Sequence, residues 1–222
     1  MATTAVSAAL KFLKGLYGGE ILKVTPFHDD RQLQKFVKGM IGTGLEAFFE
    51  TGTFRGDTLG WVAKEFPNLP CLSCESSRVF YAWARARIRA GNVHIYLEDS
   101  TEFLAEHIGS YRSALFWLDA HWGENWPILE EIRIILNSGI RGVALVDDFD
   151  IGRDGFGFDS FHGQPMNLEY LSPLIRKIHV PNYRPGVGYR GYAIIPIGIE
   201  VPVSLLSSYE PRYVSSVPRQ VS

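Results

Sequence analysis

Two uninterrupted apolar runs, each closed by aspartates, constrain this chain more than any other feature. Residues 114–118 run directly into Asp119, and residues 142–146 run directly into Asp147 and Asp148. Five apolar residues in a row are typical of a strand buried on both faces, as in a parallel sheet covered by helices. Such sheets bind ligands at the carboxyl ends of their strands. We therefore expect the three carboxylates to converge on one crevice, where they need shared protons, basic partners or a hard cation.

Length and charge restrict the class of protein. The chain has 222 residues, of which 46% are hydrophobic, and this fits one α/β domain over residues 1–222 better than two. The formal net charge of −2 gives no general attraction to nucleic acid or to an anionic membrane. No apolar stretch approaches a membrane span, and the first residues lack the order of a secretory signal. We expect a cytoplasmic protein that binds neither nucleic acid nor membrane; its oligomeric state stays open, a homodimer included.

Strand-like and helix-like segments alternate, which predicts a doubly wound, three-layer α/β sandwich with a mainly parallel, seven-stranded sheet. Residues 1–44 are expected to form introductory helices, residues 45–200 the core, and residues 207–222 a loose tail. The strands are expected at 46–50, 71–74, 93–97, 114–118, 142–146, 178–182 and 192–197. The last two are expected to pair at the sheet edge through a hairpin turn at 184–188. The helices are expected at 6–16, 30–41, 57–66 and 167–176.

The two cysteines, Cys71 and Cys74, form a lone Cys-x-x-Cys. In a strand, positions three apart face opposite sides, and no second pair of ligands accompanies them at zinc-site spacing. Two reduced thiols packed in the sheet are therefore favoured over a metal or redox site.

A glycine-rich turn follows the first predicted strand. Gly52 and Gly56 bracket it, and the missing Cβ atoms let the backbone approach a ligand, while Asp57 or Thr58 can cap the next helix. Gly-x-x-x-Gly is neither the dinucleotide spacing nor a P-loop. Glu50, directly before the turn, would repel a diphosphate. The turn is therefore predicted to hold a cofactor that is not a diphosphate.

Polar residues also end the second and third predicted strands. Glu75 and Ser76 are well placed to accept hydrogen bonds from the two hydroxyls of a ribose. Asp99 and Ser100 can contact an adenine edge or simply cap the next helix, and capping is the stronger interpretation because it needs no ligand.

This order of acid-tipped strands resembles the class I S-adenosylmethionine-dependent methyltransferases. Over roughly residues 46–149 it is most similar to the metal-dependent small-molecule O-methyltransferases of the catechol and macrocin types. The resemblance implies that the glycine turn holds the methionine part of S-adenosylmethionine and that Glu75 holds its ribose. The expected cofactor-binding residues are Glu50, Gly52, Thr53, Gly56, Thr58, Glu75, Ser76, Asp99, Ser100 and Asp119. The resemblance also implies a divalent metal, Mg²⁺, on Asp119, Asp147 and Asp148.

The chain departs from the catechol pattern after its fourth-strand acid. There, His and Trp follow the acid directly and a Lys lies just beyond, whereas here Ala120 intervenes and no lysine follows. His121 is the best candidate for the base, two positions from Asp119 on the same side of the strand, so His121 and Asp119 are the expected catalytic residues. An ordering role for His121 stays open. The metal also has an alternative, in which Asp147 and Asp148 cap a turn and Asp119 pairs with Arg55 or Arg141.

The expected function is O-methylation of a small molecule with neighbouring oxygens, which needs a deprotonated acceptor in line with the sulfonium methyl. Two alternatives remain: a metal-independent methyltransferase with His121 as base, and a cofactor-binding module without catalysis. Residues 150–163, rich in glycine and aromatic residues, are predicted to form a lid over the site. For Phe156 and Phe158 individually, packing into the core is at least as well supported.

Overall fold

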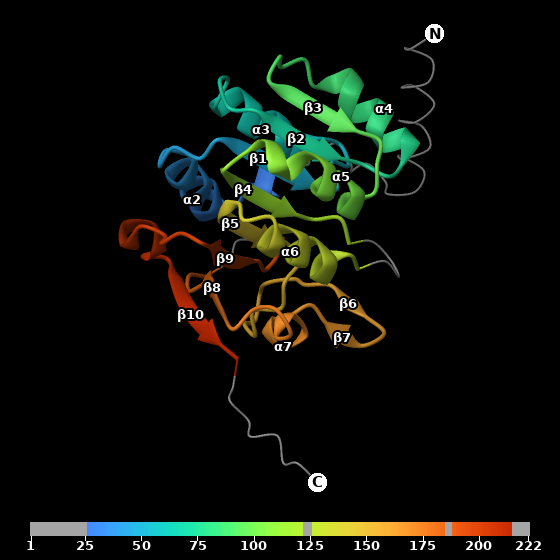
Figure 1. Ribbon diagram of the computed structural model, residues 1–222. Helices are drawn as coiled ribbons and strands as arrows, with labels where there is room; N and C mark the ends of the chain where they lie inside the picture. Colours follow the sequence, from blue (N-terminus) through green and yellow to red (C-terminus); the bar gives the residue numbers. More distant parts are fainter. Residues whose placement is uncertain (1–25, 122–125, 185–187, 215–222) are drawn as a thin grey trace.

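The computed structural model describes residues 26–121, 126–184 and 188–214. In these ranges one sheet has eight strands in the order β10-β8-β9-β5-β4-β1-β2-β3 (Figure 1). The strands are β1 (Ala47–Thr51), β2 (Cys71–Cys74), β3 (Val93–Tyr96), β4 (Ser113–Leu118), β5 (Arg141–Val146), β8 (Lys177–Pro181), β9 (Ala193–Ile197) and β10 (Tyr209–Tyr213). β1 to β5 pair in parallel, and β9, β8 and β10 add antiparallel pairs. The predicted mainly parallel α/β fold is confirmed.

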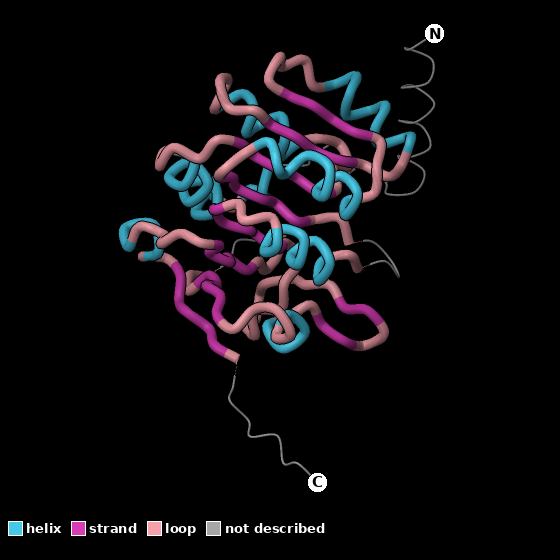
Figure 2. The backbone as a smooth tube through the Cα atoms, viewed as in Figure 1, coloured by secondary structure: helices cyan, strands magenta, loops and turns pink. Residues whose placement is uncertain are grey.

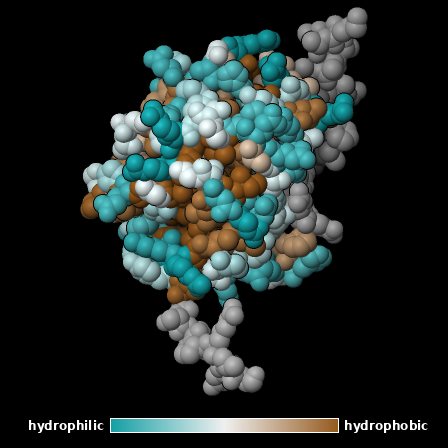
Figure 3. Space-filling view, viewed as in Figure 1, coloured by the Kyte–Doolittle hydropathy of each residue, from teal (hydrophilic) through white to brown (hydrophobic). Residues whose placement is uncertain are grey.

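Helices cover both faces of this sheet (Figure 2). They are η2 (Pro26–Asp29), α2 (Arg31–Ile41), α3 (Asp57–Glu65), α4 (Arg78–Arg87), α5 (Ser100–His107), η3 (Ile108–Ser110), α6 (Ile128–Asn137), α7 (Leu168–Leu171) and η4 (Val203–Leu206). Buried side chains of α5, α6 and α7 form one core cluster, and those of η2, α2 and α3 form the other. The face that carries α5 and α6 shows an apolar area in its middle, surrounded by hydrophilic residues (Figure 3). None of the helices in these ranges has the length and hydropathy needed to cross a bilayer.

The continuous apolar runs are explained by burial on both faces of the central strands. Every residue of β1 is buried, and so is every residue of β4 and β5 after the first. Along β4, Phe116 packs into one cluster and Trp117 into the other. Alternation of side-chain direction along β4 and β5 therefore places apolar residues on both faces, and neither strand has a polar residue after its first position.

The segment before α2 has unusual backbone geometry. Phe27, His28 and Asp29 have φ angles of 52°, 52° and 61°, in the left-handed region that residues with a Cβ rarely adopt. Phe27 is buried and makes edge-to-face contact with Trp117, with ring centroids 4.9 Å apart. Asp30 then caps α2, accepting hydrogen bonds from the backbone of the first turn at 2.8 and 3.1 Å. These contacts fix His28 at the edge of the sheet.

Several expectations about the chain after β5 are wrong. The sheet has eight strands rather than seven, because β10 lies in the segment expected to be a loose tail. β8 and β9 therefore do not close the edge, which β10 forms. The helix expected at 167–176 is only the short α7, and Ser172 already ends it at a turn before Pro173.

Two further expectations concern residues outside the described ranges, and a third, the cap of α3, is wrong. The helix expected at 6–16 and the residues of the expected turn at 185–187 lie outside the described residues. Neither Asp57 nor Thr58 caps α3: Gly56 holds the cap position in the left-handed conformation, with no side-chain hydrogen bond. Asp57 pairs instead with Arg55, and the Thr58 hydroxyl accepts from the Phe27 N–H.

Candidate functional site

The site begins with five strand ends in register. Val146, Leu118, Thr51, Cys74 and Tyr96 pair one after another across β5, β4, β1, β2 and β3. The next residue of each strand therefore emerges at the same edge of the sheet. The chain runs from β1 to β2 on one side and returns to β4 on the other, so this edge contains a topological switch point, where open α/β sheets bind ligands.

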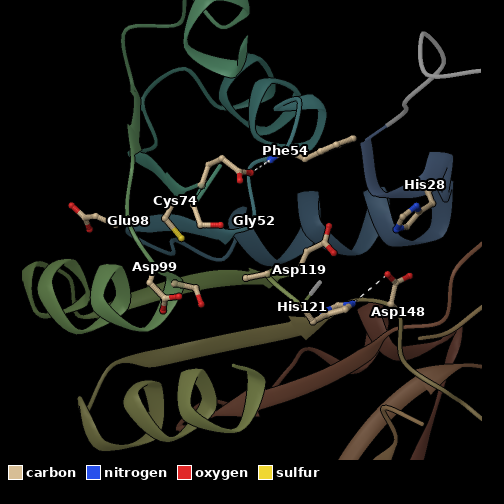
Figure 4. Close-up of a pocket in the computed structure, with 13 residues that line it drawn as sticks. His28, Gly52, Phe54, Cys74, Glu98, Asp99, Asp119, His121 and Asp148 are labelled. Atoms are coloured by element: carbon tan, nitrogen blue, oxygen red, sulfur yellow. Dashed lines mark hydrogen bonds and ion pairs between the residues drawn. The ribbon is translucent and has the colours of Figure 1, made fainter. Parts of the chain in front are cut away.

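Two adjoining cavities lie along this edge. The first, of about 330 Å³, is lined by His28, Gly52, Phe54, Cys74, Glu75, Ser76, Glu98, Asp99, Ser100, Asp119, Ala120, His121 and Asp148 (Figure 4). The second, of about 240 Å³, is lined by Phe27, His28, Glu50, Gly52, Thr53, Phe54, Arg55, Asp57, Thr58, Trp117, Asp119 and Asp147. They share four residues, His28, Gly52, Phe54 and Asp119. The two cavities therefore adjoin at these four residues.

Glu75, the expected ribose ligand, is held in place by two backbone groups. The Phe54 N–H donates to its Oε2 at 2.7 Å (Figure 4), and the Ser77 N–H donates to its Oε1 at 2.8 Å. Burial raises the pKa of this carboxyl, and the backbone N–H groups oppose the rise. Each oxygen keeps further acceptor capacity for a ligand hydroxyl. The carboxylate is therefore oriented before any ligand binds.

Asp99 and Ser100, the polar residues that follow β3, have different surroundings. Asp99 caps α5, accepting from the Thr101 N–H at 3.0 Å, so capping is confirmed for it, although it also lines the first cavity. Ser100 lines the same cavity and is buried. Behind it lies the buried Glu131 of α6. Burial raises the pKa of this carboxyl to about 7, and the polar side chains of Ser100 and Thr51 oppose the rise.

The two glycines of the turn have different surroundings. A Cβ on Gly52, whose φ is 81°, would lie 2.4 Å from the Asp119 carbonyl oxygen, so glycine is needed for β1 and β4 to meet at the site. A Cβ on Gly56 would meet the Ile88 side chain at 2.5 Å, and Gly56 lines neither cavity. The Thr53 hydroxyl is used inside the sheet, donating to the Cys74 carbonyl at 2.9 Å.

Glu50 is almost fully buried and lines the second cavity. Burial raises its pKa to about 8, and the nearby Glu75 and Asp57 contribute, while a 2.8 Å hydrogen bond from the Ser73 hydroxyl opposes the rise. A buried acid with so high a pKa favours a positively charged neighbour. The second cavity therefore offers one position suited to a cationic group.

The three expected metal ligands have different partners. Asp147 is buried, and its Oδ2 lies 2.6 Å from His28 Nε2. Asp148 Oδ2 lies 3.3 Å from His121 Nε2, and Arg190 Nε donates to its Oδ1 (Figure 4 shows the His121 contact). Asp119 makes no ion pair in the described part of the chain. Neither alternative arginine reaches it, because Arg55 pairs with Asp57 and the Arg141 guanidinium donates to the Gly198 carbonyl.

Around the aspartates, potential ligand atoms within 4.8 Å of one another form two groups, and both contain Asp148. One consists of Asp119, His121 and Asp148, and the other of His28, Asp147 and Asp148. The structure thus divides the expected trio of aspartates between two groups, each completed by a histidine.

The pKa values of Asp119 and Asp148 are shifted in opposite directions, because only Asp148 has basic partners among the described residues. Burial, together with the negative charges of Asp147 and Asp148, raises the pKa of Asp119 well above its usual value. Burial would also raise the pKa of Asp148, but hydrogen bonds from His121 and Arg190 lower it to about 2. Asp119 is therefore the acid whose charge is least compensated, and it is the one that a cation would stabilise most.

Two residues of the site had not been expected. His28 reaches Asp147 from a segment 119 positions away along the chain, and Arg190 reaches Asp148 from the segment before β9. Arg190 also contacts Asp159, a residue of the predicted lid. Nothing in their sequence neighbourhoods resembles a motif, because both contacts depend on how the terminal parts of the chain fold over the sheet. The adjacent acids Asp147 and Asp148, if buried, do however need positively charged or hydrogen-bonding partners.

The predicted lid is attached to the segment before β9 by backbone hydrogen bonds. Gly157 N–H donates to the Tyr189 carbonyl at 3.0 Å, and Gly191 N–H donates to the Gly157 carbonyl at 2.7 Å. Phe156 is buried, as the core interpretation predicts, whereas Phe158 is 44% exposed. The middle of the loop is therefore a fixed wall beside the aspartates in this structure, and movement as a lid stays a prediction.

Comparison with solved structures gives the fold. The cofactor-bound protein Rv0187 from MTB has a TM-score of 0.59 at 15% identity, and the match covers 87% of this chain and 89% of that one. An O-methyltransferase from Bacillus cereus in complex with SAH has a TM-score of 0.54 at 17% identity, with coverage of 87% and 90%. The methyltransferase domain of bacterial CtHen1 has a TM-score of 0.54 at 9% identity, with coverage of 76% and 99%.

Other comparisons add less. Two matched structures, from Staphylococcus aureus and Nostoc punctiforme, are covered over only 66% and 41% of their own chains, at TM-scores of 0.46 and 0.44. No family model and no curated protein matches the sequence. The likeness lies in three-dimensional structure at low identity, and from it we conclude that the chain has the fold of the class I S-adenosylmethionine-dependent methyltransferases.

Proposed function

We propose that the protein is an S-adenosylmethionine-dependent O-methyltransferase that acts on a small molecule with neighbouring oxygens and uses a divalent metal. The observation that carries the proposal is the row of strand ends in register, which brings Gly52, Glu75 and Asp119 to one pair of cavities. The cofactor-bound and SAH-bound structures of the same fold support the choice of cofactor. In this assignment the nucleoside occupies the first cavity, with its ribose on Glu75.

The residues present fit a divalent cation. Asp119, His121 and Asp148 offer two carboxylates and one imidazole within 4.8 Å, and Asp119 lacks another positive partner in the described ranges. This donor set suits Mn²⁺ as well as Mg²⁺. A bound cation would lower the pKa of the acceptor hydroxyl and fix its direction.

His28 is the better placed of the two histidines to take the proton of the acceptor. Its side chain is 35% exposed and lines both cavities, whereas the His121 side chain is 2% exposed. With Nε2 donating to Asp147, the Nδ1 atom is left to accept a proton. Asp147 then keeps the ring in this orientation, as a carboxylate does for a general base.

A metal-independent reaction is the second candidate, and one observation favours it. His28, His121 and Arg190 already contact Asp147 and Asp148, so two of the three acids have partners without a cation. In that reaction either histidine removes the proton unaided. Asp147 and Asp148 then serve only to orient the histidines.

Calorimetry with S-adenosylhomocysteine, with and without Mg²⁺ or Mn²⁺, tests cofactor and metal together. We expect binding of the nucleoside, and a heat of metal binding that Asp119→Asn abolishes and the exposed loop variant Asp154→Asn retains. Methyl transfer from labelled S-adenosylmethionine to a panel of catechols and vicinal diols then tests catalysis. Turnover that survives chelation would favour the metal-independent reaction, and binding without any transfer would favour a cofactor-binding module. No binding of the nucleoside would refute the proposal.

A further inference from the structure

A further group of metal-ligating side chains lies at α5, away from the three aspartates. Ligand atoms of Glu98, Glu106 and His107 lie within 4.8 Å of one another. Glu98 comes just before the cap of α5, whereas Glu106 and His107 are the last two residues of that helix. Figure 4 shows Glu98 on the far side of the first cavity from His121 and Asp148. The group is therefore separate from the candidate catalytic residues.

Two of its three ligand atoms have no partner. Glu98 Oε2 and His107 Nε2 are buried, and neither makes a hydrogen bond in the described part of the chain. They lie 3.7 Å apart, which is longer than the roughly 2.7–3.2 Å of a hydrogen bond to nitrogen. Two ligands of one zinc ion, each about 2.0–2.2 Å from it, lie about 3.4–4 Å apart. The spacing therefore fits a cation between the two atoms better than a direct contact.

The imidazole of His107 is held in place by aromatic rings. Its ring centroid lies 4.1 Å from that of Tyr96 and 5.4 Å from that of Phe103. The His107 side chain is 18% exposed and that of Glu98 is 29% exposed, whereas Glu106 is exposed to solvent. Two ligands are therefore largely fixed before an ion arrives, and the third can close over it from the solvent side.

We propose that Glu98, Glu106 and His107 bind a zinc ion that joins the two ends of α5. One imidazole and two carboxylates make a ligand set that zinc accepts, with a water in the fourth position. Mg²⁺ is less suited, because it prefers oxygen ligands in an octahedral arrangement. Since Glu98 lines the first cavity, the ion would also hold that part of the cavity wall in place. Binding of zinc here requires neither a cofactor nor an acceptor.

Titration with Zn²⁺ in the presence of excess Mg²⁺, read by competition with a chromophoric chelator, tests the site. We expect His107→Gln to bind one Zn²⁺ at least about 100-fold more weakly than the wild-type protein does, since losing a direct ligand should cost no less than losing a residue that only orients one. His94→Gln is the matched control, because His94 is an exposed histidine of β3, and it should bind as the wild type does. Asp119→Asn should retain the same His107-dependent ion.

Glu106→Gln is the second variant, and its exposed position makes it compatible with folding. It should weaken Zn²⁺ binding about 10-fold or more, because the glutamine oxygen is uncharged, whereas Glu102→Gln on the same helix should leave it unchanged. Zn²⁺ at 100 times its dissociation constant should raise the melting temperature of the wild-type protein by about 5–10 °C, and that of Glu106→Gln by less at the same concentration.

The inference is overturned if the wild-type protein binds no Zn²⁺ under these conditions. It is also overturned if Zn²⁺ binds to wild type, His107→Gln and Glu106→Gln with the same affinity and stoichiometry. In either case Glu98 and His107 would form only an ion pair across 3.7 Å. These outcomes are independent of whether S-adenosylhomocysteine binds, so the zinc site and the proposed function fail or stand separately.

Discussion

The most direct test of the electrostatics at this site is Glu50→Gln. The pKa of Glu50 rises from 4.5 in the unfolded chain to about 8 in the folded protein, chiefly because the carboxyl is buried. Each pKa unit is worth about 1.4 kcal/mol, so ionising this group in the folded protein costs on the order of 5 kcal/mol. The folded state holds its proton more tightly than the unfolded chain does. The cost is therefore absent below pH 4.5, grows as the pH rises to 8, and stays constant above it.

Glutamine has no charge to bury, and it retains an oxygen that can accept the hydrogen bond from Ser73. We therefore expect Glu50→Gln to be more stable than the wild-type protein, with a gain that increases by about 4 kcal/mol between pH 5 and pH 8.5. Urea unfolding of both proteins at the two pH values measures the gain, because the contributions of all other groups cancel in the difference. If the position beside Glu50 in the second cavity holds the ammonium group of the cofactor, the same variant should also bind S-adenosylhomocysteine more weakly.

Glu46→Gln is the control for this experiment. Glu46 is half-buried, and a hydrogen bond from the Arg112 backbone N–H lowers its pKa below the usual value of 4.5. Both the folded and the unfolded chain therefore hold this carboxyl mostly ionised above pH 5, and the stability difference of its variant should change little between pH 5 and pH 8.5. A Glu50→Gln gain that is equal at both pH values would refute the reasoning. It would mean that Glu50 ionises in the folded protein without the cost of burial.

Three further predictions concern the same edge of the sheet. Gly52→Ala should lose about 2–4 kcal/mol of stability and bind no cofactor, because its Cβ would lie 2.4 Å from the Asp119 carbonyl oxygen and the residue would keep a left-handed conformation. Urea unfolding measures the stability and calorimetry measures the binding. A variant that is as stable as the wild-type protein and still binds the cofactor would contradict this geometry. Arg190→Gln should lose about 1–3 kcal/mol of folding stability, because it removes the ion pairs of both Asp148 and Asp159. The loop at 150–163 should then be cleaved faster by a protease. An unchanged rate of cleavage would show that the backbone hydrogen bonds alone hold the loop. Asp119→Asn should raise the melting temperature of the metal-free protein at pH 7, since the raised pKa of Asp119 reflects unfavourable charge; a lower melting temperature would mean that Asp119 is already compensated.

The central part of the fold could be predicted because each strand from β1 to β5 carries its own signal. An apolar run, a polar tip and a following helix mark where each strand ends, and the parallel order then brings the tips together. Glu75 and Asp119 could be assigned to the site on this basis alone. The prediction needed no knowledge of any contact between distant segments.

The last strand of the sheet and the partners of the acids depend on contacts between distant segments, which no local sequence pattern predicts. β10 is mixed in polarity and contains Pro211, so its residues read as a tail until β8 provides a partner. The pairing of His28 with Asp147 requires the left-handed backbone at residues 27–29, which no residue there favours by itself. Local propensity therefore predicts the scaffold of the site, while tertiary packing decides which bases and acids meet.

β10 also has a consequence for how copies of this protein can associate. It is one of the two edge strands of the sheet, the other being β3, and an exposed edge strand is a template on which another chain can add. Pro211 withholds a backbone donor, and the charged pair Glu210 and Arg212, 2.6 Å apart, would lose water on such addition. Addition of a strand from a second copy of the chain along β10 is therefore disfavoured.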